Sequence, residues 1–160
     1  MSAQLVYARF PSPAHRAARD WMRAVDDVFD YHGGDLSARP ESAGPAGPIA
    51  AWRLVSDNHR EIARGCRFFA TERLARADAA VLLRHAPDLA VHPSVEPRLR
   101  TTGWFVTLDR RLVMIGARRY ENRSVARNAG ALAVRLLAEM ARDAADGAEG
   151  RERPAPEFAL

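Results

Sequence analysis

Two stretches of the chain, residues 52–83 and 104–137, show the same succession of apolar and polar positions. Each begins with a tryptophan in a short apolar run and continues through a polar turn, a second apolar run, an aromatic residue and a helix-like segment. A shift of 52 residues aligns Trp52 with Trp104 and Phe68 with Tyr120, and in the helices the shift becomes 51. A fixed internal period is typical of repeated supersecondary units. We therefore predict two tandem β-hairpin–helix repeats.

The apolar runs have the length of strands, and helical periodicity follows them. The predicted strands are 51–56, 60–64, 103–108 and 111–116. The first helix is expected to start at an N-cap on Thr71 and to end before Pro87, and the second starts at Asn122 or Ser124. Their expected core faces are Leu74, Ala77 or Asp78, Val81 and Leu82 in the first helix, and Val125, Ala129, Leu132, Leu136 and Met140 in the second. Residues 86–101, with three prolines, are expected to form a connector.

The N-terminal part of the chain carries a strand-length run at 4–10, read as an edge strand, and a helix at 13–31. Ser12 before Pro13 is a helix-start signal, and the glycines at 33 and 34 are a stop signal. Trp21 lies on the apolar face of this helix, which either docks on the repeats or mediates assembly.

These elements predict an α+β fold in which the hairpins form an antiparallel sheet covered on one face by the repeat helices, plus an N-terminal helix. The predicted organisation is an N-terminal strand and helix extension at 1–34, a Pro- and Gly-rich linker at 35–49, the tandem-repeat domain at 50–142, and a disordered polar tail at 143–160.

Charge is concentrated in the predicted repeats. Every one of the 24 basic residues is arginine, and residues 50–140 hold 16 of them against 9 acidic residues, which makes an anionic partner worth considering. The single cysteine, Cys66, excludes an intrachain disulfide and fits a reducing compartment. Neither a signal peptide nor an apolar run of about 18 residues is present, so we expect a cytoplasmic protein with no membrane partner.

Each repeat resembles the YegP-like family of small bacterial and archaeal domains, in which a hairpin followed by a helix occurs once or in tandem. The resemblance is carried by Trp52-Arg53-Leu54, Glu61-Ile62-Ala63, Phe68 or Phe69 and residues 75–82, and in the second repeat by Trp104-Phe105-Val106, residues 113–116, Tyr120 and residues 126–132. The turns differ, because the family has an Asn-Gly type turn between its strands. The resemblance implies a fold and supplies no catalytic site.

Catalytic and metal chemistry find little support in the sequence. The five histidines show no metal-ligand spacing, and there is no phosphate-binding glycine loop, so we expect no metal and no cofactor. Asp57 and His59 lie in a predicted turn and have two interpretations. They form an acid/base pair, or the turn's side chains form hydrogen bonds to the local backbone, as Asp and Asn in turns usually do. Cys66 is either a thiol activated by Arg64 and Arg67 or a small core residue. The core and turn interpretations are favoured, so we expect no enzyme.

Arginines are the best candidates for a binding site: Arg110, Arg111, Arg118, Arg119, Arg123 and Arg127. Such a set could contact phosphates, with Tyr120, Phe68 and Phe69 as stacking groups. The competing interpretation is that these arginines are solvated and the aromatic rings form core. The sequence thus predicts a non-enzymatic binding protein for nucleic acid or another polyanion, with a protein-interaction or homodimerisation module as the alternative.

Overall fold

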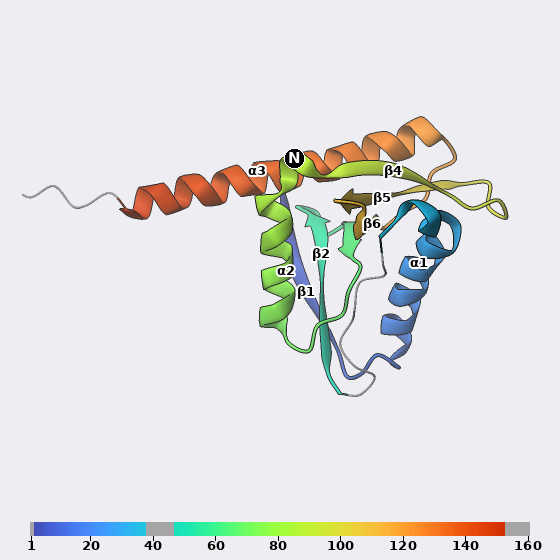
Figure 1. Cartoon of the computed structure of the whole chain (residues 1–160). Helices are drawn as coiled ribbons and strands as arrows, with labels where there is room; N and C mark the ends of the chain where they lie inside the picture. The colour runs from blue at the N-terminus through green and yellow to red at the C-terminus, as the bar shows by residue number, and fades with distance from the viewer. Residues whose placement is uncertain (1, 38–46, 153–160) are drawn as a thin grey trace, which may run out of the picture.

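The computed structural model describes residues 2–37 and 47–152. It contains one open six-stranded antiparallel sheet and three α-helices, which confirms the predicted α+β class (Figure 1). The strands follow the order β1-β2-β3-β6-β5-β4 across the sheet. Their bounds are β1 Ala3–Phe10, β2 Ile49–Ser56, β3 Glu61–Gly65, β4 Ala90–Val95, β5 Thr102–Leu108 and β6 Arg111–Gly116.

Helices pack on both faces of this sheet. Their bounds are α1 Arg16–His32, α2 Glu72–Arg84 and α3 Arg123–Glu152, and two short 3₁₀ turns span Gly33–Asp35 and Ala86–Asp88. Side chains of α2 and α3 share a core with Trp52 and Trp104, whereas α1 shares another with Phe105 and Ile115. Because neighbouring residues of a strand point to opposite faces, Trp104 and Phe105 mark the two sides.

The N-terminal segment, predicted as a strand and helix extension, belongs to the same sheet as the predicted repeats. β1 pairs with β2 over eight residues, from Ala3 opposite Ser56 to Phe10 opposite Ile49, and forms one edge of the sheet as predicted. The indole of Trp21 on α1 donates a 2.8 Å hydrogen bond to the carbonyl of Gly65. The sequence did not indicate this pairing, because the segment that contains α1 separates β1 from β2 along the chain.

The predicted element boundaries differ from the observed ones in three places. α1 starts at Arg16 after an N-cap at His15, whose Nδ1 accepts from the amide of Ala17, and not at Pro13. Ile49 already belongs to β2, while residues 38–46 of the predicted linker lie outside the described residues. α3 continues to Glu152, so residues 143–152 are helical, and 153–160 lie outside the described residues.

β4 is a strand that the sequence did not reveal, within the predicted connector. It pairs with β5 over six residues, with Pro93 opposite Trp104. Proline within a sheet is confined to edges because it has no amide hydrogen to donate. β4 is indeed the edge opposite β1.

The two halves of the fold show matching irregularities. The pairing shifts between Leu54 and Val55 in the β2–β3 hairpin, and between Val106 and Thr107 in the β5–β6 hairpin. An isolated bridge joins Ala50 to Phe69 in one half and Thr102 to Tyr120 in the other. By these bridges, the position equivalent to Tyr120 in the first half is Phe69. The alignment of the sequence places Phe68 there, one residue earlier. The tandem repeat itself stays a prediction.

The helices α2 and α3 bury only part of the predicted faces: Leu82 and Leu136 are buried and Ala129 and Met140 pack against the core, but other predicted positions are exposed. Leu74 and Val81 are 49% and 37% exposed and Val125 is 47% exposed, whereas the buried positions are mostly small. These are Ala75, Ala79 and Leu82 on α2, and Ala126, Gly130, Ala133, Leu136 and Leu137 on α3. The physical reason is the bulk of the tryptophans. A Cβ on Gly130 would lie 3.2 Å from Cδ2 of Trp104, so only a small residue lets the helix approach the ring.

Candidate functional site

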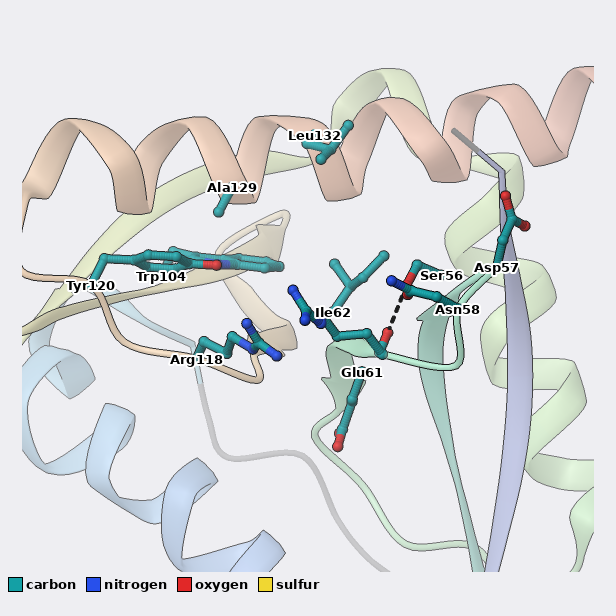
Figure 2. Close-up of a pocket in the computed structure, with 11 residues that line it drawn as sticks. Ser56, Asp57, Asn58, Glu61, Ile62, Trp104, Arg118, Tyr120, Ala129 and Leu132 are labelled. Atoms are coloured by element: carbon teal, nitrogen blue, oxygen red, sulfur yellow. Dashed lines mark hydrogen bonds between the residues drawn. The ribbon is translucent and has the colours of Figure 1, made fainter.

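A cavity of about 550 Å³ lies between the β2–β3 turn and the first half of α3, beside the ring of Trp104 (Figure 2). We call it the Trp104 cavity. Its apolar lining consists of Ile62, Trp104, Tyr120, Ala129 and Leu132, and its polar lining of Ser56, Asp57, Asn58, Arg60, Glu61 and Arg118. An apolar space with a few convergent polar groups is the usual form of a ligand site.

Trp104 is fixed tightly between two glycines. A Cβ on Gly116, at the end of β6, would lie 2.5 Å from the indole Nε1, and Gly130 brings α3 onto the same ring. The side chain is 2% exposed, but its Nε1 has no acceptor among the described residues. Because Nε1 is not among the buried side-chain atoms that lack a partner, this N–H is open to solvent. The ring therefore offers an unused donor beside the cavity.

The β2–β3 turn positions the polar side of the cavity. The amide of Ser56 donates to the carbonyl of Arg60 at 2.9 Å, and His59 has a positive φ of 59°. Asp57 accepts from the backbone amide and the hydroxyl of Ser2, and these hydrogen bonds lower the pKa of its carboxyl. Asp57 is thus held by Ser2, 55 residues away in sequence, and not by the local backbone, whereas the positive φ of His59 fits a position in the turn.

Two guanidinium groups line the cavity without a partner in the described part of the chain. Glu61 is held by Arg64 through two hydrogen bonds of 2.8 and 3.0 Å, so both acidic side chains of the lining are engaged. The side chains of Arg60 and Arg118 are exposed and make no hydrogen bond or ion pair to any residue that the structure describes. Figure 2 shows Arg118 reaching under the cavity from the segment between β6 and α3. An anion in the cavity would find both cations free.

The six predicted arginines do not form one site. Arg118 lines the Trp104 cavity, and Arg110 and Arg123 line a second cavity. Arg119 is structural, because its guanidinium donates to the carbonyls of Ser94 and Thr101 at 3.1 and 2.7 Å. The last two predicted arginines, Arg111 and Arg127, have exposed side chains.

The second cavity, of about 310 Å³, surrounds His32, His92 and Phe105. Each imidazole centroid lies 5.0 Å from that of Phe105. His32 Nε2 accepts from the amide of Val95, and burial lowers the pKa of this imidazole. His92 Nε2 lies 2.8 Å from Oγ1 of Thr107. Both histidines therefore have structural partners, and no group of three His, Cys, Asp or Glu side chains in the described ranges could hold a metal ion.

Three of the four remaining candidates from the sequence, Cys66, Phe68 and Phe69, are core residues. Cys66 is buried, and burial raises the pKa of its thiol well above the ordinary value, so the flanking arginines do not activate it. Phe68 and Phe69 are also buried, whereas Tyr120 lines the Trp104 cavity. Sequence reasoning missed Trp104 as a site residue. The sequence did contain one signal for it. The 51-residue shift places Ala129 where the first half has Asp78, so the second helix lacks the carboxylate that the first helix carries at this position.

No family model, curated protein or solved structure matches the chain. The resemblance to the YegP-like family stays a prediction. Within residues 2–37 and 47–152, no helix has the length and apolar character needed to cross a membrane.

Proposed function

We propose that the chain is a binding protein whose ligand occupies the Trp104 cavity and carries an apolar body and an anionic group. The observation that carries the proposal is an apolar cavity of about 550 Å³ beside the guanidinium groups of Arg60 and Arg118, which have no partner in residues 2–37 and 47–152. Burial of the ligand's apolar surface supplies affinity, and a charge-assisted hydrogen bond to arginine fixes its orientation.

A fluorescent probe with this chemistry is 8-anilinonaphthalene-1-sulfonate, whose emission rises in an apolar site. We expect the purified protein to bind it, and to bind the uncharged N-phenyl-1-naphthylamine more weakly. Leu132→Trp, which places an indole in the cavity and narrows it, should reduce the affinity at least about tenfold, and Arg118→Gln roughly three- to tenfold.

The matched control is Arg127→Gln, which removes an exposed α3 arginine that does not line the cavity. It should leave the probe's affinity unchanged. Equal binding by the wild-type and Leu132→Trp proteins, with both shown folded by circular dichroism, would place the probe elsewhere and refute the cavity as the site.

A nucleic-acid surface is the second candidate function. It is supported by Arg111, Arg123 and Arg127, whose exposed side chains make no hydrogen bond or ion pair with the described part of the chain. Each neutralised phosphate releases counterions, so binding of a labelled single-stranded oligonucleotide should weaken steeply as salt rises. The triple Arg→Gln variant at these positions should bind more weakly at low salt. Absence of low-salt binding by the wild-type chain would eliminate this candidate.

A further inference from the structure

Trp52 and Trp104 occupy corresponding places in the two halves. Trp52 lies in the strand before the β2–β3 turn and packs on Gly65, where a Cβ would lie 2.7 Å from the indole Cε2. Trp104 lies in the strand before the β5–β6 turn and packs on Gly116 in the same way. Both rings belong to the core beneath α2 and α3. The two indoles therefore pack alike on a glycine and beneath the helices, although the residue opposite each differs, Tyr7 for Trp52 and Pro93 for Trp104.

The two tryptophans differ in the hydrogen bonding of the indole nitrogen. Nε1 of Trp52 donates a 2.8 Å hydrogen bond to Oδ2 of Asp78 on α2. The 51-residue shift that relates the helices places Ala129 at the position of Asp78, and Ala129 lines the Trp104 cavity. Nε1 of Trp104 accordingly lacks an acceptor within the described residues, and a cavity is present at this point instead of a carboxylate.

We propose, resting on the binding function above, that the ligand's anionic group is a carboxylate that accepts from Nε1 of Trp104, as Asp78 does from Trp52. Arg118 supplies the counter-charge, and the ligand's apolar body lies against Ile62, Tyr120 and Leu132. The ligand class is a monocarboxylate with an aromatic or aliphatic body.

The donors around the cavity favour a carboxylate over a phosphate. A singly charged carboxylate can be satisfied by one indole N–H and one guanidinium group. A phosphate dianion requires more donors and more positive charge, and here it would also meet the carboxylates of Asp57 and Glu61, which line the same cavity.

The test observes the indole N–H groups by ¹H–¹⁵N NMR, with Trp21→Phe and Trp52→Phe used to assign the Trp104 signal. We expect 1-naphthoate to shift the Trp104 signal in a saturable manner. The amide 1-naphthamide and 1-naphthyl phosphate should both bind at least about tenfold more weakly. Equal affinity for the three probes, or an unmoved Trp104 signal with saturating naphthoate, would overturn the carboxylate inference.

A designed variant provides an independent check. Ala129→Asp should shift the Trp104 signal without any probe and should lower the affinity for naphthoate at least about tenfold, since it supplies the acceptor internally. Ala131→Asp adds the same charge at an exposed α3 position and should change neither. An unmoved Trp104 signal in a folded Ala129→Asp protein would count against the correspondence with Asp78.

The two proposals can fail separately. If the anilinonaphthalene probe binds in a manner sensitive to Leu132→Trp while naphthoate leaves the Trp104 signal unmoved, the cavity is a binding site and the carboxylate inference is wrong. If neither probe binds, the proposed function itself is wrong.

Discussion

At the scale of single residues, the glycines beneath the two tryptophans determine how closely the strands and indoles approach. A Cβ at Gly116 would lie 2.5 Å from Nε1 and Cε2 of Trp104, and one at Gly65 would lie 2.7 Å from Cε2 of Trp52. Neither contact can be relieved by a flexible chain end, because both rings are buried. These positions require glycine because of space and not because of backbone conformation.

We therefore expect Gly116→Ala and Gly65→Ala each to lower the free energy of unfolding by about 1–3 kcal/mol, the usual cost of overpacking a core. Urea denaturation measures this change. The control is Gly33→Ala, whose Cβ would meet nothing within 4 Å and whose φ is −59°. Loss of stability no larger than in that control would contradict the packing argument.

Asp78 makes stability depend on pH. Burial raises the pKa of its carboxyl, and the hydrogen bond from Trp52 offsets part of that effect. The folded chain thus holds the Asp78 proton more tightly than the unfolded chain, so its stabilising contribution is present below the unfolded pKa and is lost as pH rises through the folded pKa. We expect Asp78→Asn to gain stability relative to wild type as pH rises from about 3.5 to about 7. Urea unfolding at several pH values gives this difference, and a constant difference would refute it.

At the scale of elements, β1 and α1 complete a core that the rest of the chain cannot close. β1 covers the whole length of β2, and α1 contributes Ala18, Trp21, Val25 and Val28 to the core on its face of the sheet. Removing both elements would expose that core and leave β2 as a free edge, which is a site for aggregation.

We expect deletion of residues 1–36 to abolish cooperative unfolding, as followed by circular dichroism during urea titration. The matched control is truncation after Arg142, because residues 142–148 of α3 are exposed. That shorter chain should keep its unfolding midpoint. A cooperative transition in the chain lacking residues 1–36 would show that residues 37–160 fold as an independent domain.

At the scale of the whole molecule, helices on both faces leave the sheet's edges open to strand addition. β4 contains Pro93, which cannot donate to an added strand, whereas β1 presents eight residues without a proline. Self-association, the alternative predicted from the sequence, would accordingly use β1. Sedimentation velocity at several concentrations decides between a monomer and a dimer, and a monomer throughout would eliminate this alternative.

The sequence by itself determined the elements whose signals are local. The strand-length apolar runs, the Thr71 cap and the stop after His32 involve residues within a few positions of each other, and they appear in the structure as expected. Only the tertiary structure decided which residues meet over long distances. The pairing of β1 with β2, the edge strand β4, the small buried residues of α2 and α3, and the cavity beside Trp104 depend on residues far apart in the sequence. Ala3 and Ser56, for example, pair across 53 positions. Local periodicity records that a face is apolar, but the shape of the opposing surface decides which side chains are buried there and where a cavity is left.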